Sequence, residues 1–270
     1  GDESYPYLEK ITRARILSYS SMGGGDIWAD AIVHTPSALK FTVHGLGDAF
    51  TIESPMIGMY NVPNSLAAIG ISMGGLHIAV EVVQEAFRTV QMVPGRMERV
   101  DLGQDFLAIV DFAHTPNAIK QALLTARELT EGKVIAVFGS AGLRDVEKRK
   151  LMPKTAAQLA DVMFLTAEDP RTESLDAILA DMAEGARAGG SVEGQDFCLV
   201  PDPGTAIRRA VGQAEKGDLV IVCGKGHEQS MCFGHIEYPW DDSTALRAAL
   251  ADLLEVDGPA MPELPTSHKA

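Results

Sequence analysis

The sequence predicts an α/β protein whose second half is a doubly wound parallel sheet. Five runs of Val, Ile, Leu and Phe occur there without alternating polar residues, which is typical of strands buried on both faces. Helical segments separate these runs along the chain, as βαβ units require. In the first half, shorter runs alternate apolar and polar residues between Gly, Pro and Ser turns, which indicates hairpins.

Residues 1–93 are expected to form these hairpins, followed by two helices. The alternating runs cover residues 13–20, 26–34, 38–46 and 49–55. Apolar residues then recur at helical spacing over 61–76 and 78–90, and Leu66, Ile69 and Met73 fall on one face of the first of these helices.

The pair Pro94-Gly95 interrupts the helical pattern and marks the expected domain boundary. Beyond it, residues 94–257 should form the doubly wound domain. Its strands are expected at 106–113, 133–140, 161–168, 196–202 and 218–225, and its helices at 116–130, 147–160, 174–188, 203–216 and 242–256. We expect residues 258–270 to be a disordered tail.

Composition excludes several classes of function. The chain has 23 Lys and Arg against 37 Asp and Glu, a net charge of −14, which disfavours nucleic acid as a partner. No apolar run approaches the roughly 20 residues of a membrane span. Three cysteines in 270 residues favour a reducing, cytoplasmic setting over a disulfide framework. The chain starts without Met or a signal-peptide pattern, so we expect it to be processed or a piece of a longer protein.

Polar residues gather in the segments that follow the five buried strands. These segments are 111–116, 139–145, 167–171, 201–205 and 224–228. In a doubly wound sheet they meet at the carboxyl edge, where ligands bind. Taken singly, each is ambiguous: residues 139–142 fit a phosphate cradle or a tight turn, His114 a site or a satisfied interior histidine, and Arg171 a ligand contact or a surface charge.

Six motifs, taken in order, resemble the Mur ligase family, in the branch that adds the third amino acid of the peptidoglycan stem. They are YNVPNSLAAIG, PGRMERV, VDFAHTPNAI, VFGSAGLRDVEKRKLM, TAEDPRTESL and CGKGHE. The resemblance covers about residues 1–255. A polyglutamate or cyanophycin synthetase of the same superfamily fits less well, because the AHTP, DPR and GKGHE segments occur together.

The resemblance implies the C-terminal part of a central P-loop ATPase domain, followed by a Rossmann-like domain that recruits an amino acid. In this family ATP phosphorylates the carboxylate of a UDP-sugar peptide, and the amine of the amino acid attacks the acyl phosphate. The implied partners are ATP, Mg²⁺, UDP-N-acetylmuramoyl-dipeptide and a diamino acid.

Four residues match nucleotide contacts of the family. Asn61 matches an asparagine that contacts adenine, although an N-cap role is an open alternative. Arg96 and Asp111 match residues that approach the nucleotide, with Asp111 accepting from ribose hydroxyls. His114 matches a position near the phosphates, where an N–H donor stabilises developing charge.

The resemblance implies an amino-acid site built from Arg144, Asp169, Arg171, Gly224 and Glu228. Relatives that use meso-diaminopimelate read Asp-Asn-Pro-Arg where this chain reads Glu-Asp-Pro-Arg. Arg171 favours a distal carboxylate, which a guanidinium binds bidentately, whereas Asp169 favours a distal ammonium. Diaminopimelate carries both groups; lysine or ornithine stays a competing choice. The family's Gly-Gly-Asp or Gly-Gly-Asn step is Ala141-Gly142-Leu143 here.

No G-x-x-G-K-[ST] P-loop occurs in the sequence. Most contacts to the ATP phosphates and Mg²⁺ are therefore expected upstream, and this chain alone should not catalyse ligation. The alternative is a non-catalytic module that binds an amino acid or nucleotide.

A zinc site is a further alternative. Cys223, His227, Cys232 and His235 are close in sequence. Their spacing matches no established finger, and Cys223 ends a buried strand, so we expect no metal.

Overall fold

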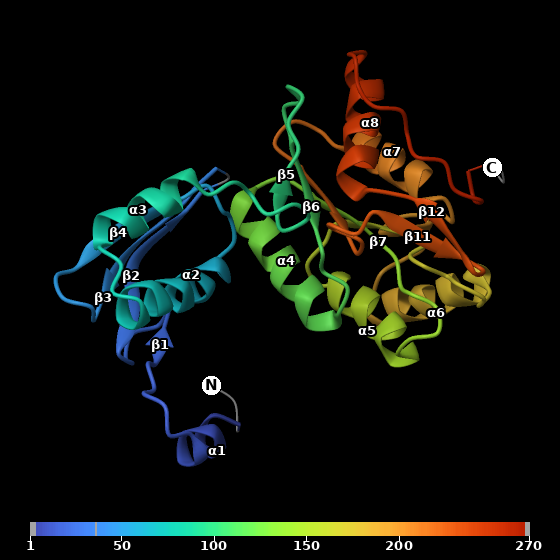
Figure 1. Cartoon of the computed structure of the whole chain (residues 1–270). Coiled ribbons are helices and arrows are strands. Elements are labelled where there is room, and N and C mark those ends of the chain that lie inside the picture. The colour runs from blue at the N-terminus through green and yellow to red at the C-terminus, as the bar shows by residue number, and fades with distance from the viewer. Residues whose placement is uncertain (1–3, 36, 268–270) are drawn as a thin grey trace. The chain divides into compact units, whose positions relative to one another are not determined.

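The computed structural model describes residues 4–35 and 37–267. The chain divides into two compact units, Gly1–Gln91 and Met92–Ala270 (Figure 1). Each unit is described by itself.

Unit 1 contains a four-stranded sheet in the order β1-β2-β3-β4. After helix α1 (Ser4–Ile11), its elements are β1 (Tyr19–Ser20), β2 (Ile27–His34), β3 (Leu39–His44), β4 (Phe50–Ser54), α2 (Asn61–Ile69), a π-helical segment η1 (Gly70–Gly75) and α3 (Val80–Thr89). Strands β2, β3 and β4 pair antiparallel. Buried side chains of these strands form one core with Leu66 and Ile69 of α2, as the helical spacing predicts.

One expectation for unit 1 is wrong, and one predicted helix is present with an unexpected geometry at its end. The run 13–20 pairs only at Tyr19–Ser20, and in parallel with β2, because the Asp26 carboxylate accepts from the Ser18 N–H at 2.8 Å and closes a loop there. The helix expected over 61–76 changes to π geometry at Gly70. Its sequence, GISMGG, contains three glycines, which lower the preference for a regular α-helix.

Unit 2 contains a six-stranded sheet, and the predicted doubly wound α/β class is confirmed. Its strands are β5 (Glu98–Arg99), β6 (Leu107–Asp111), β7 (Val134–Phe138), β8 (Val162–Leu165), β9 (Phe197–Leu199) and β10 (Leu219–Cys223). The order is β5-β6-β10-β7-β8-β9. All neighbours pair in parallel except β5, which is antiparallel to β6. The last strand, β10, thus lies in the middle of the sheet.

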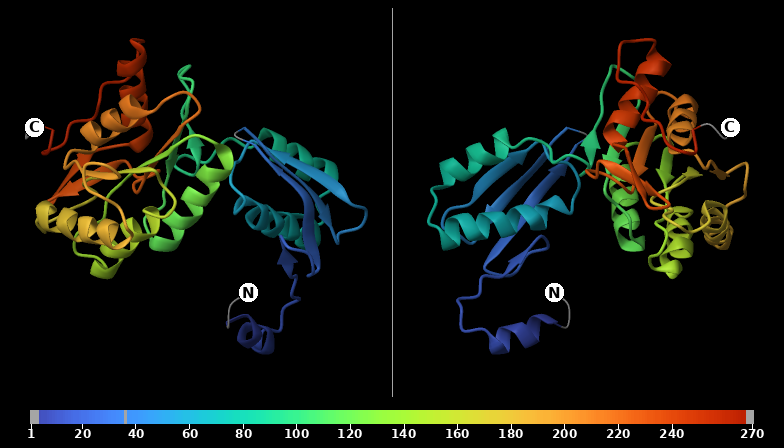
Figure 2. Two further views of the ribbon diagram at one scale, coloured as in Figure 1. Left: turned by 180° about the vertical axis from the view of Figure 1, so that it is seen from behind. Right: turned by 45° about the vertical axis from the view of Figure 1, so that its right-hand side comes forward.

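Helices cover both faces of this sheet (Figures 1 and 2). They are α4 (Pro116–Leu129), α5 (Val146–Ala156), α6 (Leu175–Ala188), α7 (Pro203–Gln213) and α8 (Asp242–Leu254). The first three cover one face, and α7 and α8 the other. The side chains of Thr115, Ser174, Asp202 and Asp241 cap α4, α6, α7 and α8. Phe138 and Phe164 are 1 % exposed, and burying each contributes about 2 kcal/mol.

Two C-terminal features differ from the sequence-based expectation. A hairpin, β11 (Ser230–Phe233) and β12 (Ile236–Pro239), follows β10. Residues 258–267, expected to be disordered, pack on unit 2: Leu264 is buried, and Thr266 donates to the Asp202 carboxylate at 3.0 Å. Residues 268–270 of the expected tail lie outside the described residues. Among the helices that the structure describes, none is long and apolar enough to span a bilayer.

Candidate functional site

The segments that follow the parallel strands meet at the carboxyl edge of the sheet in unit 2. Gly224, after β10, donates its N–H to the carbonyl of Asp111, the last residue of β6, at 3.2 Å. Gly142, after β7, donates to the Asp169 carbonyl, after β8, at 2.9 Å. Because β10 lies between β6 and β7, its GKGHE segment lies between the other two groups of predicted site residues. The expected convergence is observed for the segments after β7, β8 and β10 and for the end of β6.

Lys225 joins two of the predicted substrate contacts. Its Nζ is 3.0 Å from Asp169 Oδ2 and 2.5 Å from Glu228 Oε2. The Lys225 side chain is 6 % exposed, while that of Glu228 is 45 % exposed. Burial lowers the pKa of Lys225, but its hydrogen bonds to Glu228 and Asp169 outweigh burial and raise it. The lysine is therefore a permanent cation between two carboxylates.

Hydrogen bonds to β11 hold the backbone of the Asp169–Arg171 turn. Arg171 donates its N–H to the Cys232 carbonyl at 3.0 Å, and Gly234 donates to the Arg171 carbonyl at 2.8 Å. Asp169 Oδ1, the carboxylate oxygen that does not contact Lys225, accepts from the Cys232 N–H at 2.8 Å. Asp169 and Arg171 have φ values of 41° and 54°, in a region that costs a non-glycine residue about 1–2 kcal/mol. The hairpin stabilises this strained turn, so the unexpected element positions the predicted arginine.

Glu168 and Gly224 lie in close contact beneath this turn. A Cβ on Gly224, where φ is +131°, would lie 2.5 Å from Glu168 Oε2. Only glycine therefore allows this approach. Glu168 is 8 % exposed, and burial, the largest cause, raises the pKa of its carboxyl to about 7.

Asp242 is a second buried carboxyl next to the GKGHE segment. It accepts from the Gly226 N–H at 2.8 Å and from Trp240 Nε1 at 2.7 Å. Burial raises its pKa to about 6, against the lowering effect of these hydrogen bonds. Asp242 thus fixes the backbone of the segment.

Asp111 holds the backbone on the other side of the edge. Its two carboxylate oxygens accept from the N–H groups of Met97 and Ala113, each at 2.9 Å, and the residue is 7 % exposed. Met97 has a φ of 46°, so the carboxylate stabilises an unfavourable turn. A carboxylate oxygen keeps a second lone pair, and the ribose contact of Asp111 stays a prediction.

The Phe112 ring contacts side chains of the other residues predicted near the nucleotide. The Arg96 guanidinium lies over its ring, 4.6 Å from the centroid. The rings of His114 and His227 lie 4.5 Å and 4.8 Å from it. His114 Nδ1 is 2.8 Å from the Phe112 carbonyl, which leaves Nε2 as the other hydrogen-bonding atom of the imidazole. The structure therefore brings Arg96, Asp111 and His114 together.

The Pro94-Gly95 turn reaches the GKGHE segment. A Cβ on Gly95 would lie 2.3 Å from the backbone of Gly226 and His227. This contact needs glycine, which explains why the turn before β5 is part of the site rather than only a linker.

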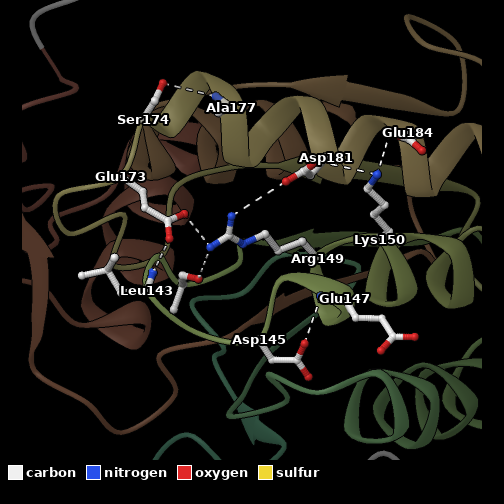
Figure 3. A network of polar contacts seen from close by, with 11 residues as sticks. Leu143, Asp145, Glu147, Arg149, Lys150, Glu173, Ser174, Ala177, Asp181 and Glu184 are labelled. Atoms are coloured by element: carbon white, nitrogen blue, oxygen red, sulfur yellow. Dashed lines mark hydrogen bonds and ion pairs between the residues drawn. The ribbon is translucent and has the colours of Figure 1, made fainter.

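Arg144 and Arg149 have different surroundings in the segment after β7. Arg144 is exposed. The side chain of Arg149 is 5 % exposed, and its Nη2 is 2.6 Å from Glu173 Oε2 (Figure 3). Glu173 Oε1 accepts from the Leu143 N–H at 2.8 Å. Arg149 thus joins the segments after β7 and β8, which leaves Arg144 as the cation accessible to a ligand.

Asn61 belongs to unit 1. The N-cap of α2 is Tyr60, and Asn61 donates its side-chain amide to the Ile57 carbonyl at 2.7 Å. The alternative N-cap role is therefore wrong. Its adenine contact stays a prediction.

Among residues 4–35 and 37–267, no group of three His, Cys, Asp or Glu side chains could hold a metal ion. Cys223 is buried, and burial raises the pKa of its thiol well above the ordinary value. A metal assay on protein purified without a metal-affinity step would test this expectation.

The sequence-based reasoning missed Lys225, Glu168, Asp242 and Arg149. Lys225 and Glu168 stand in the quoted motifs, but no periodicity distinguishes a buried charge from an exposed one. Their burial depends on strand order and on the hairpin, which bring distant residues over them.

The matches with known proteins agree with this fold and site. Residues 95–226 match the family model described as "Mur ligase, glutamate ligase domain". Residues 95–226 of unit 2 are thus a Mur ligase C-terminal domain.

Individual relatives show which ligases the chain is similar to. The chain is 40% identical over 240 residues to a UDP-N-acetylmuramyl-tripeptide synthetase of Roseiflexus sp. (strain RS-1), covering 89% of this chain and 47% of that protein. It is 39% identical over 250 residues to a UDP-N-acetylmuramoyl-L-alanyl-D-glutamate–2,6-diaminopimelate ligase of Geobacillus thermodenitrificans (strain NG80-2), covering 91% and 49%. The chain therefore spans about half the length of the curated relatives it matches.

A solved UDP-N-acetylmuramoyl-L-alanyl-D-glutamate–2,6-diaminopimelate ligase matches with a TM-score of 0.63 and 30% identity. It covers 93% of this chain and 50% of that one. A MurF ligase from Thermotoga maritima, solved in complex with ADP, matches with a TM-score of 0.60 at 19% identity, which supports the fold alone.

Proposed function

We propose that this chain is the C-terminal half of a cytoplasmic, ATP-dependent amide ligase. The complete enzyme adds a diamino acid, as the third residue, to UDP-N-acetylmuramoyl-dipeptide in peptidoglycan synthesis. The observation that carries the proposal is the cluster of Asp169, Arg171, Lys225 and Glu228 at the carboxyl edge. Its two cations and two carboxylates match a zwitterionic amino acid, and the name of one relative states the diamino acid 2,6-diaminopimelate.

The incoming amino acid would bind between the segments after β8 and β10. Arg171 and the exposed Arg144 are the donors for carboxylates, and a guanidinium forms the strongest pairs with them. The Gly224 carbonyl and Glu228 carboxylate are the acceptors for an ammonium group. These groups would hold the amine for its attack on an acyl phosphate, which is catalysis by positioning.

The nucleotide would bind on the side of β6. Arg96 supplies a cation and His114 an N–H donor toward developing phosphate charge; Asp111 accepts from the ribose and Asn61 contacts the adenine. Mg²⁺ would neutralise phosphate charge. We assign most Mg²⁺ and phosphate ligands to the part of the relatives that this chain does not span.

Ligand titration tests the amino-acid site. Calorimetry on the 270-residue chain with meso-diaminopimelate, lysine and ornithine should show the tightest binding for diaminopimelate. Arg171→Ala should weaken diaminopimelate binding much more than lysine binding, because only diaminopimelate has a distal carboxylate. Equal losses for both ligands would remove this role from Arg171.

An activity assay tests whether this chain catalyses ligation by itself. The chain alone should form no ATP-dependent product from UDP-N-acetylmuramoyl-dipeptide and diaminopimelate. Product formed by this chain as the sole protein would refute the assignment of the phosphate ligands to upstream sequence. Amino-acid binding with no ligation, even in the complete protein, would favour the non-catalytic module.

A further inference from the structure

Lys225 sits where a substrate ammonium could otherwise bind. Its Nζ contacts Asp169 Oδ2 at 3.0 Å and Glu228 Oε2 at 2.5 Å, and its side chain is almost fully buried. Burying a lysine is costly unless it is paired, and both of its partners are candidate substrate contacts. The lysine therefore sets the charge that this part of the pocket offers to a ligand.

Asp169 is the carboxylate that Lys225 controls most directly. Its Oδ1 already accepts from the Cys232 N–H at 2.8 Å, and its Oδ2 is bound to Lys225. The Arg171 guanidinium lies 3.9 Å from the same Oδ2, longer than a hydrogen bond. Lys225 therefore balances the charge of the Asp169 carboxylate, and Arg171 is not required as its counter-ion.

Charge balance shows what would change without Lys225. Asp169 and Glu228 carry two negative charges, and Lys225 and Arg171 two positive ones, so the cluster is neutral. Removing the lysine leaves one excess negative charge, and Arg171 becomes the nearest cation for Asp169. Such a pocket would attract an ammonium group more strongly and a carboxylate less strongly.

We propose that Lys225 determines the charge specificity of the amino-acid site. By holding Asp169, it leaves the Arg171 guanidinium for the distal carboxylate of the incoming amino acid. It thus selects a diamino acid whose side chain ends in both an ammonium and a carboxylate over one that ends in an ammonium alone. A ligand without a distal carboxylate would leave the Arg171 guanidinium unpaired. Proteins commonly discriminate between ligands by leaving a charge unpaired in the wrong complex. This inference rests on the proposed function.

Titration of the 270-residue chain with meso-diaminopimelate and L-lysine tests it. The wild type should prefer diaminopimelate. In Lys225→Met that preference should fall roughly tenfold or more, because a buried charge pair has been broken. Lys216→Met, which removes an exposed lysine before β10, is the matched control and should leave the preference unchanged.

A second variant separates specificity from simple damage to the fold. Asp169→Asn/Lys225→Met should regain the preference for diaminopimelate, because Arg171 no longer has a competing carboxylate. A merely structural lysine would show no such rescue. If Lys225→Met does not fold, Asp169→Asn is compared with Asp169→Asn/Lys225→Met. Both variants should show the same preference for diaminopimelate, because neither has an Asp169 carboxylate for Lys225 to hold.

The outcomes separate this inference from the proposed function. Binding of neither amino acid by the wild type would refute the amino-acid site itself. Wild-type binding of diaminopimelate, with the same preference in Lys225→Met, would overturn only the role of Lys225. An unrescued loss of the preference in a folded double variant would also overturn it.

Discussion

The two sides of the carboxyl edge are built by different interactions. On the side of β7, β8 and β10, buried cations join the segments: Arg149 pairs with Glu173, and Lys225 with Asp169 and Glu228. On the side of β6, Asp111 accepts from two backbone N–H groups, and Arg96 and two histidines surround Phe112.

This difference predicts different sensitivities. In these pairs the cation is almost fully buried, and its carboxylate partners offset the cost of removing that charge from water. A carboxylate that accepts backbone N–H groups fixes a turn, and its loss costs ordinary hydrogen-bond free energy. We therefore expect the β7–β8–β10 side to respond strongly to charge and pH, and the β6 side to respond less.

Removing Arg149 should have the largest effect. Arg149→Met leaves Glu173 and Asp181 without their buried partner, and we expect the free energy of unfolding to fall by about 3 kcal/mol. Urea denaturation measures it. Arg208→Met is the control, because Arg208 pairs with Asp252 at the surface and should change stability by about 1 kcal/mol or less. Equal losses would contradict the comparison.

Glu168 should make stability depend on pH. Its pKa is about 7 in the folded chain, above its ordinary value of 4.5, so the fold favours the protonated form. Stability should therefore be lost progressively as pH rises from about 4.5 to 7. Glu168→Gln removes this loss, and its stability relative to wild type should rise by up to about 3 kcal/mol between pH 4.5 and 8.

Chemical denaturation of wild type and Glu168→Gln across this pH range measures the effect. Asp242, whose pKa is about 6, lowers the stability of both proteins in the same direction. Because its charge also raises the pKa of Glu168, Glu168→Gln removes this coupling as well. A pH-independent difference would show that the pKa of Glu168 is not raised on folding.

Asp111→Asn should have a smaller effect on the β6 side. The amide keeps one acceptor oxygen but turns an NH₂ donor toward either Met97 or Ala113, so one hydrogen bond to a charged acceptor is lost. We expect the free energy of unfolding to fall by about 2 kcal/mol. Asp105→Asn, at an exposed position, is the control. A loss as large as that of Arg149→Met would remove the contrast between the two sides.

The contact between Arg96 and Phe112 should contribute least. A double-mutant cycle with Arg96→Met and Phe112→Leu should give a coupling free energy of about 0.5–1 kcal/mol. Thermal or urea unfolding of the four proteins measures it. A coupling above about 2 kcal/mol would mean that this side, too, depends on a desolvated charge.

The main elements of unit 2 were predictable because each leaves a local pattern. Five apolar runs and the intervening helical periods identify β6–β10 and α4–α8. The hairpin β11–β12 was not predicted, because its stability comes from pairing with the Arg171 turn as well as within itself. Residues 258–267 were likewise misread, because Leu264 and Thr266 are anchored by residues of the α7 region that are distant in sequence.

The sequence by itself determined the doubly wound class, the resemblance to Mur ligases and the segments that form the carboxyl edge, since periodicity and motifs are local properties. Only the tertiary structure decided how these residues are used. It placed β10 at the centre of the sheet, buried Lys225 between Asp169 and Glu228, and made Arg149 rather than Arg144 the internal cation. The physical reason is that burial and charge pairing depend on which distant segments cover a side chain, and no local pattern contains that information.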